Sequence, residues 1–213
     1  MPNDPSESST SRGRRFPAEV LTAAEVGRLL DACSRTAPTG LRNRALIVIL
    51  WRGGLRVSEA LALTPKDVDR NAGTLHVLDG KGGKQRMVAL DPLAFGVIER
   101  WLEARKLLPV PSHAPVICTL AGKRVQTAYV RALLPRLASR AGIEKRVHAH
   151  GLRHTFACEL MRERMPINLI QKQLGHASLA VTSRYLQHVT PPELVEAMQR
   201  REWPEEASSA LDA

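Results

Sequence analysis

Apolar residues recur at helical spacing along much of the chain and predict a mainly helical protein. In the first half of the chain, this spacing predicts helices over residues 23–33, 41–53, 57–63 and 92–107. Thr22 and Glu25 form a capping-box pattern at the start of the first helix, and Asp91-Pro92 suits the start of the fourth. Because residues 45–51 are all apolar, the second helix is expected to lie in the core.

The second half of the chain continues the helical pattern. Helices are predicted over residues 125–141, 152–165, 167–174, 180–188 and 192–201. Gly175 is placed to end the third of them, since glycine is common directly after a helix. A short strand is also expected over residues 116–118.

Between residues 73 and 90 the pattern changes to alternation, which is typical of strands. Residues 74–78 and 86–90 are expected to pair as a β-hairpin, and the glycine-rich segment 79–84 between them carries Lys81 and Lys84. The predicted fold class is therefore α+β, mainly α-helical, with a small antiparallel β-sheet. An architecture of this kind names no function by itself.

The two ends of the chain differ in composition from the rest. Residues 1–18 are basic and rich in Ser and Pro, and are expected to form a flexible leader. Residues 204–213 are expected to form a short disordered tail. Residues 19–203 remain as one folded domain, which suits a chain of 213 residues with 44% hydrophobic content.

The charge balance points to a polyanionic partner. The net charge is +10, and 24 of the 31 basic residues are Arg. Nucleic acid is the commonest polyanion, so a surplus of fixed cations favours a DNA- or RNA-binding protein. A general arginine bias with well-hydrated side chains would give the same total, and the placement of particular residues must decide between the two.

Several features favour a cytoplasmic location. No apolar run approaches the roughly 18 to 20 residues that cross a bilayer, and the first residues lack the apolar stretch of a secretory signal. Three widely spaced cysteines, Cys33, Cys118 and Cys158, fit a reducing compartment better than a disulfide framework. They are expected to be small buried apolar residues.

Four segments carry polar residues that stand out. They lie where a helical core would favour apolar residues, or where neighbouring glycines leave them exposed. In order they supply Arg56, Lys81, the pair His150 and Arg153, and then His176 followed nine positions later by Tyr185. Guanidiniums can hold two phosphate oxygens at once, and imidazole can exchange a proton near neutral pH. A tyrosine hydroxyl becomes a usable nucleophile where cations and a base lower the cost of deprotonation.

This order and spacing resembles the catalytic domain of the tyrosine recombinases, the phage integrase family, over about residues 19–200. The resemblance implies the recombinase catalytic-domain fold for residues 19–203. It implies that Tyr185 forms a 3′-phosphotyrosyl link while Lys81 protonates the released 5′-hydroxyl. It further implies supporting roles for Glu59 and His154, and chemistry that needs neither ATP, metal nor cofactor.

The resemblance also implies partners. Double-stranded DNA would be the substrate, and the protein would assemble on it as a homo-oligomer, a tetramer. The segment 192–203 would be a helix that either docks on a neighbouring protomer or folds back on its own core. Most members place a helical core-binding domain before the catalytic domain. The short leader is therefore expected to match the layout of the short DNA invertases, with a fragment of a longer protein as the alternative.

Most of these residues also have a plainer interpretation. Arg56 could form an ordinary surface pair with Glu59, and Lys84 competes with Lys81 for the acid role. His176 could be a helix cap, and Tyr185 a core residue of an amphipathic helix. Tyr129 is the only other tyrosine and lies outside the pattern.

Two metal-dependent alternatives are disfavoured. His148, His150 and His154 lack a nearby Cys or carboxylate to complete a metal site, and Gly151 is expected to leave His150 outside a regular helix. A metal-dependent nuclease would need converging carboxylates, and the only suggestive pair is Asp67 and Asp69. Those two residues lie in a Pro-Lys-Asp turn, where Asp is common.

The function predicted from the sequence is that of a site-specific DNA recombinase or integrase. Two alternatives stay open at this stage. One is a non-catalytic DNA-binding regulator with the same fold. The other is a type IB topoisomerase-like activity that relaxes DNA through the same chemistry.

Overall fold

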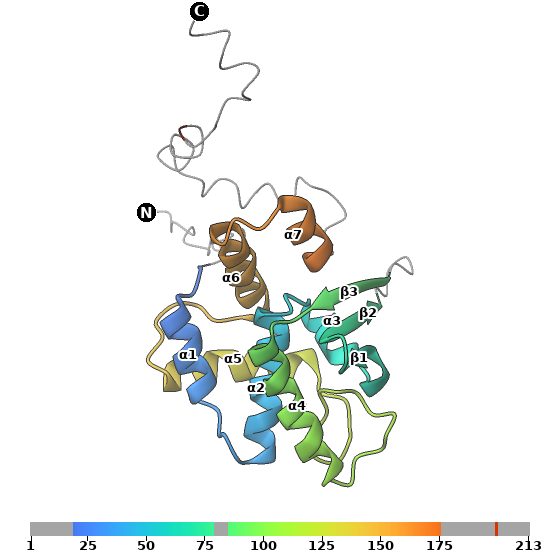
Figure 1. Cartoon of the computed structure of the whole chain (residues 1–213). Coiled ribbons are helices and arrows are strands. Elements are labelled where there is room, and N and C mark those ends of the chain that lie inside the picture. The colour runs from blue at the N-terminus through green and yellow to red at the C-terminus, as the bar shows by residue number, and fades with distance from the viewer. Residues whose placement is uncertain (1–18, 79–84, 176–198, 200–213) are drawn as a thin grey trace, which may run out of the picture. The chain divides into compact units, whose positions relative to one another are not determined.

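The computed structural model describes residues 19–78, 85–175 and 199, which fall into two units, residues 1–156 and 157–213 (Figure 1). The leader 1–18, the tail 204–213 and the helices expected over 180–188 and 192–201 lie outside the described residues or are represented only by Gln199. The helices of the first unit are α1 Ala23–Asp31, α2 Pro38–Trp51, α3 Val57–Ala62, the 3₁₀ helix η1 Pro65–Asp67, α4 Pro92–Lys106 and α5 Thr127–Arg140. Helix α6, Ala149–Arg162, runs across the unit boundary, and α7, Ile167–Leu174, belongs to the second unit.

The predicted starts and ends of several helices are confirmed by their caps. At the start of α1, the Thr22 hydroxyl accepts a hydrogen bond from the Glu25 N–H at 3.2 Å, and the Glu25 carboxylate accepts one from the Thr22 N–H at 2.7 Å. Asp91 caps α4 by accepting from the Ala94 N–H at 2.9 Å. Gly175 ends α7 in the left-handed conformation, with φ of 65°.

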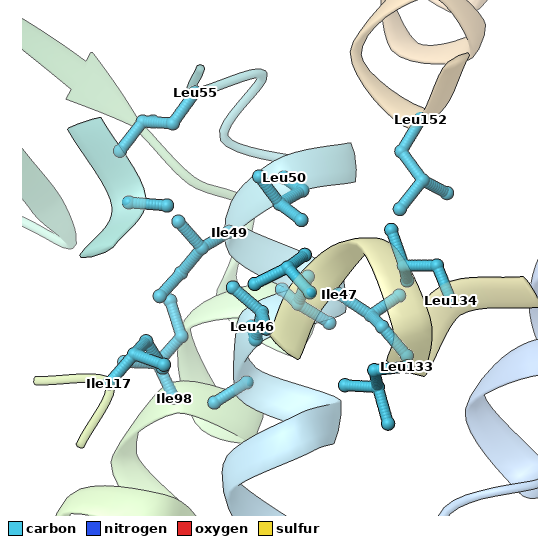
Figure 2. Close-up of a cluster of buried hydrophobic side chains, with 14 of the residues drawn as sticks. Leu46, Ile47, Ile49, Leu50, Leu55, Ile98, Ile117, Leu133, Leu134 and Leu152 are labelled. Carbon is cyan, nitrogen blue, oxygen red and sulfur yellow. The ribbon is translucent and has the colours of Figure 1, made fainter. Parts of the chain in front are cut away.

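Helix α2 lies at the centre of the hydrophobic core. Its residues 45–50 are all at most 2% exposed, as the apolar run predicted. Figure 2 shows its side chains among those of Ile98 from α4, Leu133 and Leu134 from α5, and Leu152 from α6. Helix α2 has no polar face, as expected for a helix that other elements cover. The later elements of the unit pack around it.

The small antiparallel sheet has three strands in the order β1-β2-β3. The strands are β1 Val68–Asp69, β2 Thr74–Leu78 and β3 Gln85–Ala89. In the hairpin Leu75 is opposite Val88 and Val77 is opposite Arg86, so these four residues share the inner face of the sheet. The hairpin was predicted, while the two-residue strand β1 was not.

The strand expected over residues 116–118 is wrong. Within the described residues that segment forms only an isolated bridge between Cys118 and Arg124. The backbone groups of Val116 are used elsewhere, because its N–H donates to the Leu63 carbonyl at 2.7 Å and its carbonyl accepts from the Trp101 indole at 2.7 Å. The segment therefore ties α3 and α4 together and does not extend the sheet.

The start of α6 also differs from the prediction. The helix begins at Ala149, so His150 and Gly151 lie inside it, and the expectation that Gly151 leaves His150 outside a regular helix is wrong. The His148 ring packs against the first turn, where a Cβ added at Gly151 would lie 3.0 Å from that ring. Glycine here permits a close contact and does not break the helix.

The remaining expectations concern cysteines and membranes. Cys33, Cys118 and Cys158 are all buried, as expected for small apolar residues. No helix in the described ranges is long and apolar enough to cross a membrane.

Candidate active site

Arg56 lies at the N-terminal cap of α3, directly after a glycine-rich turn. The turn is possible because Gly54 adopts φ of 62°, which side-chain-bearing residues rarely do. Gly53 is equally constrained, since a Cβ there would lie 2.7 Å from the Ile49 carbonyl oxygen. The chain thus leaves α2, reverses, and presents the Arg56 side chain with 44% of its surface exposed.

Arg153 reaches the same turn from α6. Its Nη1 donates a hydrogen bond of 2.6 Å to the carbonyl oxygen of Gly54, although the two residues are 99 positions apart. Arg153 is only 3% exposed, so its guanidinium is held in a fixed position. The two arginines that the sequence singled out are therefore brought to one place, because Arg153 is bonded to Gly54, two residues before Arg56.

The first described residues contact α6 and the segment before it. The Leu21 N–H donates to the Thr155 hydroxyl at 3.0 Å, and the Lys145 ammonium donates to the Val20 carbonyl at 3.1 Å. Thr155 is fully buried and directly follows His154. These contacts join residues more than 120 positions apart and fix the helix that carries Arg153.

His150 lies three residues before Arg153 in α6, which places both on one face of the helix. Partial desolvation lowers the pKa of His150, and the positive charges of Arg153, His148 and Arg56 lower it further. The lowered pKa favours the neutral imidazole, the form that can accept a proton.

Glu59 is a buried partner of Arg56 and is not part of an exposed pair. Its carboxylate accepts from the Arg56 N–H at 2.8 Å and from the Arg56 Nη1 at 2.6 Å, and its side chain is only 6% exposed. This geometry rules out the plainer interpretation of a surface contact. It agrees with the supporting role that the resemblance implied for Glu59.

Arg86 is a member of this cluster that the sequence did not reveal. From strand β3 its two terminal nitrogens donate to the two oxygens of Glu59, at 2.9 Å and 2.8 Å. One sequence signal could have identified it. In the alternating pattern of β3, Arg86 and the buried Val88 share the inner face, where an unpaired cation would be costly.

A cavity of about 280 Å³ lies next to His150. Its apolar lining comes from Val57, Val130 and Ala149, and its polar lining comes from Thr127, Arg131, Arg146, His148 and His150. Cations thus surround an apolar floor next to His150. This combination suits a ligand with an anionic backbone and apolar sugar or base surfaces.

The structure places some candidate residues and leaves others unplaced. His154 is half-buried in α6, one residue after Arg153. Lys81, Lys84, His176 and Tyr185 lie outside the described residues, and so does the helix expected to carry Tyr185. Their roles remain predictions from the sequence pattern.

The carboxylates that could have served a metal-dependent nuclease are used in turns. Asp67 accepts from the Thr64 N–H and hydroxyl, and Asp69 accepts from the N–H groups of Asn71 and Ala72. Among the described residues, no group of three or more His, Cys, Asp and Glu side chains is arranged to hold a metal ion. The Tyr129 hydroxyl accepts a hydrogen bond from Arg42 inside the fold.

The buried Glu59 should make stability depend on pH. Burial raises its pKa, but the hydrogen bonds from Arg86 and the Arg56 N–H outweigh that effect and lower the pKa from 4.5 to about 2. A carboxyl group whose pKa is lower in the folded than in the unfolded state stabilises the fold at pH values above its unfolded-state pKa. This stabilisation is lost as the pH falls toward the folded-state pKa. We therefore expect the Glu59 contribution, up to about 3 kcal/mol, to disappear between about pH 4.5 and pH 2.

Denaturant unfolding at pH 7 and pH 3 measures this effect. The free energy of unfolding of the wild type should fall more between these two pH values than that of the Glu59→Gln variant. Glu103→Gln is the matched control, because its ion-paired carboxylate is 53% exposed and should change the pH dependence much less. Equal pH dependence in wild type and Glu59→Gln would contradict the assignment.

Comparisons with known proteins show the family of this chain. The model of the phage integrase family matches residues 19–190. Tyrosine recombinase XerD of Bifidobacterium longum is 36% identical over 195 residues, covering 87% of this chain and 63% of its own length. Tyrosine recombinase XerC of Xanthomonas axonopodis pv. citri is 36% identical over 172 residues, covering 81% of this chain and 54% of its own length.

Solved structures show the same fold. The XerA recombinase crystal structure has a TM-score of 0.74 at 30% identity, covering 87% of this chain and 66% of that one. XerH site-specific recombinase bound to difH substrate in a pre-cleavage complex has a TM-score of 0.71 at 33% identity, covering 87% and 55%. The chain thus spans between about half and two thirds of the length of these relatives.

Proposed function

Since the chain belongs to the phage integrase family, we propose that it cleaves and rejoins DNA strands as a tyrosine-type site-specific recombinase. The observation that carries this proposal is the hydrogen bond from Arg153 to the Gly54 carbonyl, which fixes one guanidinium beside the turn that presents the other. His150 lies on the same face of α6 as Arg153. A phosphodiester held there would meet two guanidiniums and a neutral imidazole.

This arrangement suits phosphoryl transfer without a metal ion. During attack, the phosphorus passes through a five-coordinate state with extra negative charge on its non-bridging oxygens, and fixed cations stabilise that state. Arg56 is exposed and can reach a bound phosphate, while Arg153 is rigid and pre-positioned. The lowered pKa of His150 favours the neutral form, which can accept a proton from the attacking hydroxyl.

The proposal assigns the covalent step to residues outside the described ranges. Tyr185 attacks the phosphorus, forms a 3′-phosphotyrosyl bond and displaces the 5′-oxygen, which Lys81 protonates. His176 supports the bound phosphate. The bond energy is kept in the phosphotyrosyl ester, so a 5′-hydroxyl can reverse the step without ATP.

Two other functions share the same fold, and one experiment separates them. Supercoiled plasmid carrying candidate sites is incubated with the protein, and the reaction is stopped in detergent. Covalent adducts with strand exchange support the recombinase, and relaxation without exchange supports a type IB topoisomerase-like enzyme. DNA binding with neither product supports a non-catalytic regulator and contradicts the proposal.

We propose double-stranded DNA as the partner and a homo-oligomer, a tetramer, as the acting form. One solved relative, XerH, is bound to a palindromic difH substrate. A palindrome presents two equivalent half-sites, which symmetric copies of one chain can occupy. Three widely spaced, buried cysteines fit a reducing compartment, so we place the reaction in the cytoplasm.

The cations around the cavity should supply part of the DNA affinity. Arg131 and Arg146 line the cavity beside His150, and both are exposed. Each phosphate contact contributes about one unit to the slope of log affinity against log salt concentration. We expect Arg131→Ala and Arg146→Ala each to weaken DNA binding and to reduce this slope by about 1.

Salt titrations of binding to a labelled duplex measure both changes. Arg136→Ala is the matched control, because Arg136 is exposed on α5, the helix that carries Arg131, but does not line the cavity. Its slope should stay close to that of the wild type. If all three variants behave alike, the cavity is not part of the DNA surface.

A further inference from the structure

Arg86 forms the most complete ion pair of the site, yet it lies in a strand and not in any of the segments that the family pattern singles out. Its two terminal nitrogens bind the two oxygens of Glu59 in a forked geometry, the strongest form of such a pair. The side chain of Arg86 is 13% exposed, compared with 44% for Arg56. Both terminal nitrogens of Arg86 are therefore directed at Glu59, whereas the Arg56 side chain stays largely exposed.

The charges of this cluster decide what Arg56 can offer to a phosphate. Glu59 carries one negative charge and contacts both arginines. With Arg86 present, the three side chains sum to one positive charge. Without Arg86, the charges of Glu59 and Arg56 would cancel, and Arg56 would be drawn more strongly toward the buried carboxylate.

The geometry adds a second effect. Glu59 also accepts the Arg56 backbone N–H at 2.8 Å, so its carboxylate holds both the backbone and the guanidinium of Arg56. The forked pair with Arg86 holds both oxygens of that carboxylate and so orients it. Strand β3 thus determines where the exposed guanidinium of α3 lies.

We propose that Arg86 is a positioning residue, which neutralises and orients Glu59 so that the cluster presents a net positive charge, through Arg56, to the scissile phosphate of DNA. This inference rests on the proposed function only for the identity of that phosphate. Arg86 itself does not touch the DNA. Its effect passes entirely through Glu59.

Restoring the charge balance by a second substitution tests this mechanism. Arg86→Met removes the neutralising charge and should lower affinity for a target duplex about tenfold, and cleavage at saturating DNA by at least as much. The double variant Glu59→Gln, Arg86→Met removes both opposite charges and again leaves Arg56 with its own. Because the amide oxygen introduced at position 59 can still accept from Arg56, the double variant should recover affinity to within about threefold of the wild type.

Two further variants complete the set, all measured at a temperature where circular dichroism shows them folded. Arg86→Lys keeps the charge but loses the fork, and should bind DNA more tightly than Arg86→Met. Arg70→Met removes an arginine from an exposed pair with Glu103 and should change DNA affinity less than about twofold, which controls for total charge.

The inference is overturned if Arg86→Met binds DNA like the wild type, or if the double variant binds as weakly as Arg86→Met. The second result would mean that Arg86 contacts DNA itself or acts only through packing. DNA affinity is measured without any reaction, so the test does not depend on catalysis. Recovery of affinity in a protein that forms no covalent adduct would support the role of Arg86 and contradict the recombinase proposal.

Discussion

Replacing Tyr185 with Phe is expected to abolish covalent linkage to DNA while leaving folding and DNA affinity nearly unchanged. Phenylalanine keeps the ring but lacks the hydroxyl that attacks phosphorus. Tyr129, the one tyrosine among the described residues, is hydrogen-bonded to Arg42. A labelled duplex incubated with the protein and resolved on a denaturing gel shows the adduct as a slowly moving band. We expect this band to fall below detection in Tyr185→Phe.

Tyr129→Phe is the matched control for this experiment. Tyr129 is the only other tyrosine, and its hydroxyl is 2.5 Å from the Arg42 Nη2 within the fold. Removing that hydroxyl should lower stability by about 1 kcal/mol without removing the adduct. An adduct that persists in Tyr185→Phe and disappears in Tyr129→Phe would reverse the assignment.

Replacing Arg153 with Lys should reduce the rate of cleavage at saturating DNA by about a hundredfold or more. Lysine keeps the positive charge, but its single ammonium cannot donate to the Gly54 carbonyl and to a phosphate in the planar geometry of a guanidinium. The conservative change therefore removes the fixed direction of the contacts and leaves the charge. Single-turnover cleavage of a nicked substrate, which traps the covalent product, measures the rate.

Arg162→Lys provides the comparison, because Arg162 is exposed at the end of the same helix. It should cleave at a rate within about twofold of the wild type. Unfolding measurements on both variants separate loss of the Gly54 contact from loss of catalysis. Near-normal cleavage by folded Arg153→Lys would show that the guanidinium geometry is not needed.

The helices were predictable because their signals are local. Thr22 with Glu25, Asp91 with Pro92, and Gly175 each mark a boundary through contacts within a few residues, and all three are found as expected. The apolar run of α2 could also be interpreted correctly, since only a covered helix lacks a polar face. Strand β1 was missed because a strand of two residues is too short to show an alternating pattern.

The errors arose where side-chain and tertiary contacts decide the local structure. Val116 was expected in a strand, but Leu63 and Trp101 occupy its backbone groups. Gly151 was expected to exclude His150 from a helix, but the His148 ring uses the space that a side chain would fill. Neither contact can be inferred from spacing along the chain.

The candidate site shows the same division. The sequence pattern supplied Arg56, Glu59, His150 and Arg153, and the structure brings these four together. It did not supply Arg86, whose importance depends on facing Glu59 across the fold. Nor could it show that Arg153 is fixed by the Gly54 carbonyl, since that contact needs a left-handed glycine 99 residues away.

The central claim is that the chain breaks DNA by joining a strand to Tyr185 through its 3′-phosphate. Peptide mass mapping of the wild-type adduct, combined with end labelling of the released strand, tests it most directly. We predict a nucleotide on the peptide containing Tyr185 and a 5′-hydroxyl that accepts phosphate from a kinase. A nucleotide on any other residue, a 5′-phosphotyrosyl bond, or cut strands with no attached protein would contradict it.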